Sequence, residues 1–68
     1  MKVFSKQLNP KCTEIWVSGD AGLIAKAKLK KYDDDYKLNI SWVKYNADIH
    51  ELSDSLEKIW SKAYEFLD

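Results

Sequence analysis

Arginine is missing from this chain, and all eleven of its cationic side chains are lysines. Bidentate guanidinium contacts, which proteins use to grip phosphates and guanine bases, are therefore not open to it. A single cysteine, Cys12, excludes an internal disulfide and a cysteine-rich zinc site. Long apolar runs are also missing, so the sequence predicts neither a signal peptide nor a membrane span, and we expect a cytoplasmic location.

Glycine and proline are scarce as well, with two residues and one residue, so turns are few and easily placed. A length of 68 residues allows one domain, 1–68, and 46% hydrophobic and 13% aromatic residues are typical of a folded chain. The net charge is zero, yet residues 1–32 carry seven lysines and two acids, and residues 33–68 carry four lysines and nine acids. These regions either neutralise each other within the domain or form a dipolar surface that steers a charged partner.

The clearest pattern begins at Tyr36. Residues 36–42 alternate apolar and polar side chains, which predicts a half-buried strand. From Ile49 the period changes to three and four residues, which predicts an amphipathic helix over 49–67 that begins with a capping box formed by Asp48 and Glu51. The stripe expected to face the core consists of Ile49, Leu52, Leu56, Ile59, Trp60, Ala63 and Leu67.

Three more strands are predicted upstream, over residues 2–8, 12–18 and 23–31, with a hairpin loop at 19–22. The predicted fold is α+β: an antiparallel four-stranded β-meander followed by one C-terminal amphipathic α-helix packed on one sheet face. A three-stranded sheet with a loose N-terminus is the alternative. In the strand over 23–31, Leu23, Ala25, Ala27 and Leu29 point one way, and Ile24, Lys26, Lys28 and Lys30 point the other way.

Two registers are possible between the last two strands. One sets Leu29 opposite Ile40 and Lys30 opposite Asn39, whereas the other sets Lys30 opposite Lys37. Because like charges directly opposite each other destabilise a sheet, we expect the first register.

One helix covers only one side of a sheet, so the opposite side is the candidate binding surface. The residues expected to contact a partner there are Trp16, Ile24, Val43 and Tyr45, gathered near the 19–22 loop, and Lys26, Lys28 and Lys30, toward the 33–35 turn. Aromatic anchors beside charge are typical of a protein interface, so we expect a protein partner. In the alternative, this patch is covered by Phe4 or Leu8, or by a second copy of the chain.

The sequence also allows another class of partner on this face and one other binding surface. The same lysines together with Lys31, and with the rings of Trp16, Tyr32 and Tyr45, also suit a nucleic-acid platform, although zero net charge and the lack of arginine count against it. The acidic flank of the helix, formed by Glu51, Asp54 and Glu57, is a further possible contact surface.

No sequence motif indicates catalysis or metal binding. His50 lies four residues before Asp54 but has no serine or cysteine nucleophile at a useful spacing, so we expect a surface histidine. The aspartates at 33–35 do not match the spacing of a calcium loop and predict a solvated turn. We therefore expect a protein that is not an enzyme and needs no cofactor. Small motif-free domains with an exposed binding face are typical of inhibitors and adaptors carried by phages and mobile elements.

Overall fold

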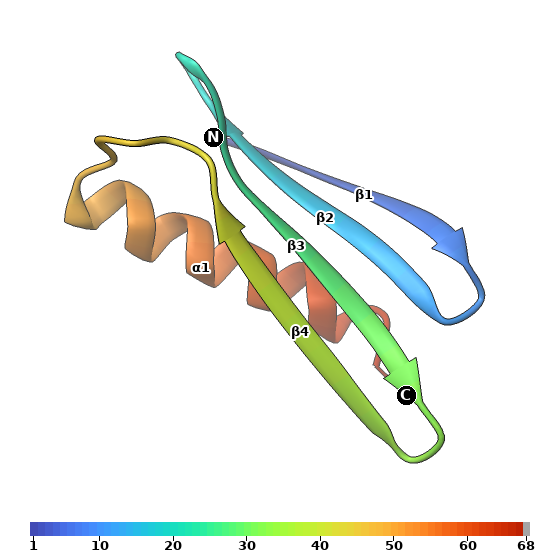
Figure 1. Cartoon of the computed structure of the whole chain (residues 1–68). Helices are drawn as coiled ribbons and strands as arrows, with labels where there is room; N and C mark the ends of the chain where they lie inside the picture. The colour runs from blue at the N-terminus through green and yellow to red at the C-terminus, as the bar shows by residue number, and fades with distance from the viewer. Residues whose placement is uncertain (68) are drawn as a thin grey trace.

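The computed structural model describes residues 1–67, which form one sheet with one helix against it (Figure 1). The elements are β1 (Lys2–Asn9), β2 (Cys12–Gly19), β3 (Gly22–Tyr32), β4 (Asp35–Trp42) and α1 (Ile49–Tyr64). The strands are antiparallel and lie in the order β1-β2-β3-β4. The predicted meander followed by a helix is confirmed with all four strands, and the three-stranded alternative is wrong. Within residues 1–67, no helix is long and apolar enough to cross a membrane.

The register between β3 and β4 differs from the predicted one. Lys30 lies opposite Lys37, so the expected pairing of Leu29 with Ile40 is wrong. The cause is the turn, because only residues 33 and 34 separate the paired ends of the strands, and a two-residue loop sets the register of a hairpin. In the predicted register the last hydrogen-bonded pair would be Tyr32 with Lys37, because the even-numbered residues of β3 bond to β4, and the loop would have four residues. One exposed like-charge pair costs about 0.5 kcal/mol, which is too little to force this longer loop.

A β-bulge changes the side of the sheet on which Ile24 lies. The pairing of β2 with β3 shifts between Val17 and Ser18, which leaves Ile24 as the extra residue of β3. Ile24 is therefore turned into the core, with 2% of its surface exposed, and not onto the open face where simple alternation placed it. Gly19 makes room for this side chain, because a Cβ at position 19 would lie 2.8 Å from Ile24 Cδ1.

The core lies between the sheet and α1. Its buried apolar residues are Ile15, Val17, Ile24, Ala25, Ala27, Leu29, Ile59 and Ala63. The small side chains of Ala25 and Ala27 on the sheet and of Ala63 on the helix leave room for a close approach of the two layers. Ser55 is also fully buried on the helix, and its hydroxyl donates to Met1 Sδ at 3.8 Å.

The helix begins as predicted and ends earlier than predicted. Asp48 is the N-cap, and its Oδ1 accepts a hydrogen bond from the Glu51 N–H at 2.8 Å. The Glu51 carboxylate does not reach back to complete the capping box and accepts instead from Lys44 Nζ at 2.6 Å. The last helical residue is Tyr64, three residues before the predicted end at Leu67.

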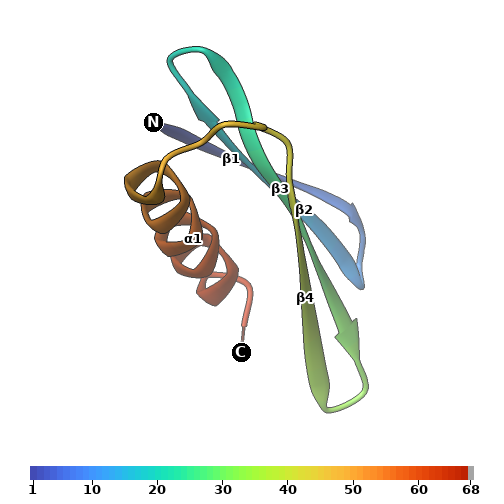
Figure 2. The same cartoon turned by 60° about the vertical axis from the view of Figure 1, so that its left-hand side comes forward.

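The buried stripe of α1 is rotated relative to the one that periodicity predicted. The buried helix residues are Ser55, Ile59 and Ala63. Ile49, Leu56 and Trp60, which were expected in the core, are 69%, 38% and 42% exposed. Within residues 1–67 the backbone of α1 lies close to β1, β2 and β3 but not to β4 (Figure 2). The apolar flank of the helix on the β4 side is therefore left in contact with water.

Candidate binding surface on the open sheet face

The side of the sheet opposite α1 faces solvent. Alternate residues of each strand project there, because successive side chains of a strand point to opposite faces. We call this surface the lysine face. It is formed by Lys2, Phe4, Lys6, Glu14, Trp16, Lys26, Lys28, Lys30, Lys37, Asn39, Ser41 and Val43. This surface is basic although the whole chain is neutral, because its six lysines outnumber the carboxylates of Glu14 and of Asp35, which lies on the same side at the start of β4.

An aromatic pair forms one part of the lysine face. Phe4 and Trp16 lie directly opposite each other on β1 and β2, and they are 52% and 41% exposed. Lys26 is the neighbour of Trp16 on β3, with its Nζ 5.9 Å from the ring centroid. A shallow apolar depression is lined by Phe4, Lys6 and Trp16. Exposed rings flanked by cations are the kind of residue that anchors a macromolecular partner.

The next row across the sheet places a carboxylate between two lysines. Lys6, Glu14, Lys28 and Asn39 are successive cross-strand neighbours from β1 to β4. Side chains directly opposite each other have their Cβ atoms about 5 Å apart, so Glu14 lies within the field of both lysines. The lysine face is therefore a mosaic of charge and not a uniformly cationic surface.

Five of the seven residues predicted for partner contact lie on the lysine face. These five are Trp16, Lys26, Lys28, Lys30 and Val43. Ile24 is not among them, because the bulge buries it.

Tyr45 is not on the lysine face either. Strand β4 ends at Trp42, and the N–H groups of Val43 and Lys44 both donate to the Ile24 carbonyl oxygen, at 2.8 and 3.1 Å. The chain then leaves the sheet in a turn, where the Tyr45 side chain is fully exposed. The expected cluster of four apolar side chains near the 19–22 loop is therefore wrong.

Phe4 lies on this surface, although the sequence predicted it only as a side chain that could cover the patch and not as a contact residue. Val3 and Phe4 are both apolar, so alternation alone did not show which of them faces the core. The structure half-buries Val3 against the core and places Phe4 beside Trp16. Lys2 and Lys6 lie two residues before and after Phe4 and therefore project from the same face of the strand. These two lysines are the signal in the sequence that Phe4 faces solvent.

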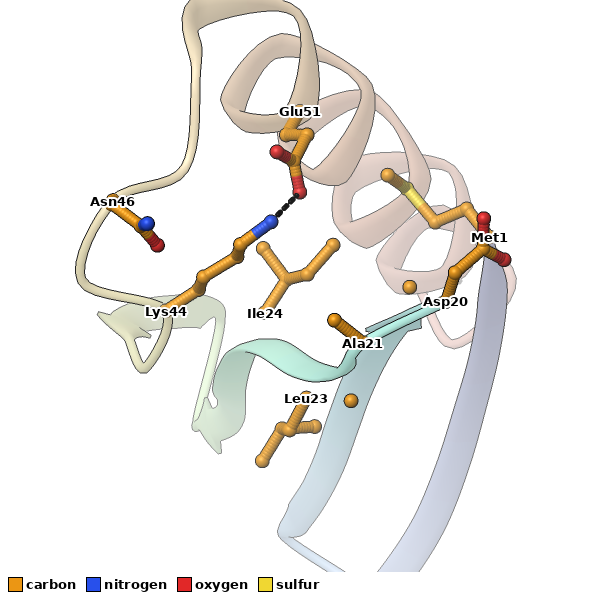
Figure 3. A pocket seen from close by; sticks show the side chains of 10 residues that line it. Met1, Asp20, Ala21, Leu23, Ile24, Lys44, Asn46 and Glu51 are labelled. Atoms are coloured by element: carbon orange, nitrogen blue, oxygen red, sulfur yellow. Dashed lines mark hydrogen bonds and ion pairs between the residues drawn. The ribbon is translucent and has the colours of Figure 1, made fainter.

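A pocket of about 550 Å³ lies elsewhere, where the β2–β3 hairpin approaches the start of α1 (Figure 3). Residues 19–24 of the hairpin line it together with Met1, Lys44, Asn46 and Glu51. Lys44 and Glu51 form the ion pair described above, which ties the segment after β4 to the first turn of the helix. This pair engages the charges of Lys44 and Glu51 with each other, so neither is free to hold a ligand there.

Among the residues that the structure describes, the titratable side chains outside the lysine face do not converge on a reactive centre. His50 is exposed at the start of α1. Within residues 1–67, no three histidine, cysteine or acidic side chains lie close enough together to hold a metal ion. On the acidic flank of the helix, Asp54 and Glu57 are exposed, whereas Glu51 is engaged by Lys44.

No protein-family model, curated protein or solved structure matches this chain.

Proposed function

We propose that the protein is a non-enzymatic interaction module that binds another protein stoichiometrically through the lysine face. The observation that carries the proposal is the exposed pair of Phe4 and Trp16, flanked by lysines on an uncovered sheet. Aromatic side chains at the centre of an interface supply most of its binding energy. Lysines around them accelerate encounter with an acidic surface. The expected partner therefore offers an acidic surface with an apolar depression for Trp16.

Glu14 favours a protein over a nucleic acid as that partner. A phosphate backbone laid across the lysine face would meet this carboxylate between Lys6 and Lys28 and would be repelled by it. A protein surface, in contrast, can place a cation opposite Glu14 and carboxylates opposite the lysines. The absence of arginine points the same way, because lysine offers only a point charge to a phosphate.

The proposed mode of action is that of an inhibitor or adaptor, of the kind carried by phages and mobile elements. Such a protein occupies a surface of its target and needs no turnover. The contacts expected to matter are Trp16 and Val43 as anchors, with Lys26, Lys28 and Lys30 steering the approach. Phe4 joins them because of its position beside Trp16.

The test is a pull-down with the tagged protein from cells that express it naturally, with and without nuclease. The proposal predicts one discrete protein, recovered in near-equal amounts under both conditions. Trp16→Ala is expected to weaken the purified complex at least tenfold, which is the effect of losing a central aromatic anchor. Trp60→Ala is the matched control, because Trp60 is 42% exposed but lies on the helix. The proposal is wrong if Trp16→Ala leaves the complex unchanged.

Charge reversal separates the lysine face from the acidic flank of the helix. The double variant Lys26→Glu/Lys28→Glu is expected to slow association with the partner, and Asp54→Lys/Glu57→Lys is expected to leave it unchanged. Because all four residues are exposed, both double variants are expected to fold. The reverse outcome would move the contact surface to the helix.

Nucleic acid is the second candidate, favoured by the excess of lysine on an aromatic-bearing sheet face. It is tested by fluorescence anisotropy with a labelled single-stranded oligonucleotide. A nucleic-acid function with about five phosphate contacts predicts a loss of roughly 100-fold in affinity between 50 and 200 mM salt. It also predicts tighter binding by Glu14→Gln, whereas a protein partner paired with Glu14 predicts a weaker complex for the same variant.

A further inference from the structure

The two edges of the sheet are not equally protected against pairing with another strand. On β1, Lys2 and Lys6 lie along the edge, the register with β2 is irregular between Gln7 and Asn9, and Pro10 follows. Lysines, irregular pairing and proline are the features by which natural sheets prevent their edges from pairing. Strand β4 has none of these beyond Lys37, and its register with β3 is continuous from Tyr32–Asp35 to Ala25–Trp42. The β4 edge is thus a regular strand that remains open to a partner.

The hydrogen-bonding groups on this edge are regularly spaced. The Val43 N–H donates to Ile24 on β3, and the direction of bonding alternates along a strand. The odd-numbered residues of β4 therefore bond to β3. The backbone N–H and C=O groups of Tyr36, Leu38, Ile40 and Trp42 point away from β3, outward from the edge and in the plane of the sheet. No other strand of residues 1–67 pairs with them.

The same strand carries an apolar surface on the helix side, and α1 does not lie over it. Ile40 is half-buried, and Trp42 is 44% exposed. On the helix, the Ser55 hydroxyl contacts Met1 beside β1, which fixes the side of α1 that faces β1. Leu56 and Trp60 lie on the other side of the buried line formed by Ser55, Ile59 and Ala63, and this side is the flank toward β4. We call Ile40, Trp42, Leu56 and Trp60 the β4 flank. An added strand with one apolar side could bond to the unprotected edge and bury its apolar side against the neighbouring apolar surface.

We propose that a second copy of this chain pairs through β4 and the β4 flank, so that two sheets join into one antiparallel sheet across a two-fold axis. Centring the axis on Asn39 sets Leu38 opposite Ile40 of the second copy and Tyr36 opposite Trp42 of the second copy. All four outward-pointing residues then find backbone partners. Side chains on the helix face meet as one aliphatic and one aromatic pair, each formed twice, as an isologous contact requires.

The charges of β4 agree with self-pairing in this register. Lys37 falls opposite Ser41 of the second copy, and Asn39 falls opposite itself, so no like charges meet. A two-fold axis also places both helices on the same side of the joined sheet, with the β4 flanks facing each other. The two tryptophans of each flank offer about 200 Å² of exposed aromatic surface per copy. With one strand pairing added, the interface is at the small end of specific contacts, so we expect a dimer of micromolar affinity.

Sedimentation equilibrium of the purified chain between 1 and 500 µM tests the proposal. The expected result is a monomer–dimer equilibrium with no larger species. Trp60→Ala is expected to weaken dimerisation at least tenfold, and Trp16→Ala, with nearly the same exposure on the other face, is expected to leave it unchanged. A chain that stays monomeric throughout, or a dimer that responds to Trp16 and not to Trp60, overturns the proposal.

A charge pair tests the register itself without disturbing the core. Ser41 is exposed and faces Lys37 of the second copy in the proposed pairing, so Ser41→Glu is expected to tighten the dimer and Ser41→Lys to weaken it. Amide exchange provides a direct readout, because the N–H groups of Leu38 and Ile40 should become protected as concentration rises. Equal effects of both substitutions, or exchange that is independent of concentration, would contradict the two-fold pairing. These measurements need only the purified chain, so their outcome does not depend on the partner of the lysine face.

Discussion

The rotation of α1 about its axis can be tested by comparing two isoleucines on the same helix. Ile59 is fully buried, whereas Ile49 is 69% exposed, although the hydrophobic pattern places both on one stripe. Truncation of a buried isoleucine to alanine lowers the free energy of unfolding by about 2–5 kcal/mol, including the cost of the cavity. An exposed position changes it by about 0.5 kcal/mol or less, because little burial is lost and alanine favours the helix. A domain of this size has roughly 3–10 kcal/mol of total stability, so Ile59→Ala removes a large part of it.

The assay is urea denaturation followed by tryptophan fluorescence, at a concentration where sedimentation shows a monomer. With a slope of about 1 kcal/mol per molar urea, Ile59→Ala should lower the midpoint by about 2 M or more, and Ile49→Ala should lower it by less than about 0.5 M. Similar losses for the two variants would mean that the helix buries the stripe expected from periodicity. That result would refute the exposed β4 flank as well.

Three further predictions concern single residues and use the same denaturation assay. Gly22 has a φ of 120°, so Gly22→Ala should cost about 1 kcal/mol or more, whereas Ala21→Gly should cost less. Asp48→Ala removes the N-cap bond to the Glu51 N–H and should cost about 1 kcal/mol, and Asp48→Asn should restore most of this loss. Lys44→Met breaks the ion pair with Glu51, whose two side chains are 27% and 29% exposed, and should cost about 1 kcal/mol at most.

The elements of this fold could be predicted from local patterns because each pattern has a local cause. Alternation over residues 36–42 predicts a strand, since apolar side chains on one face need a core. The change of period at Ile49 predicts the helix, and Asp48 predicts its start. Both glycines fall at the turn of one hairpin, Gly19 at the end of β2 and Gly22 at the start of β3. These signals depend on neighbours in the sequence and survive in the folded chain.

The bulge and the helix rotation depend on distant contacts, and the β3–β4 register depends on which aspartates form the turn. The alternation of apolar and polar side chains carries neither kind of information. The two-residue turn between β3 and β4 decided the register against a weak charge repulsion at Lys30 and Lys37. The bulge at Ile24 inverted one side chain and removed it from the candidate site. The rotation of α1 followed from its position over β1 to β3, which allowed the small Ser55 to be buried and left Trp60 exposed. A correct register between β1 and β2 would also have placed Phe4 beside Trp16 on the lysine face.

Contact between the lysine face and a protein can be detected by site-specific photocrosslinking. A benzophenone amino acid replaces Phe4, which is 52% exposed on the lysine face, or His50, which is exposed at the start of α1 and serves as the control. After irradiation in nuclease-treated lysate of cells that express the protein naturally, we expect a covalent adduct with one other protein from position 4 and none from position 50. Adducts from position 50 alone, or none from position 4 while the partner is still recovered by pull-down, would contradict this contact.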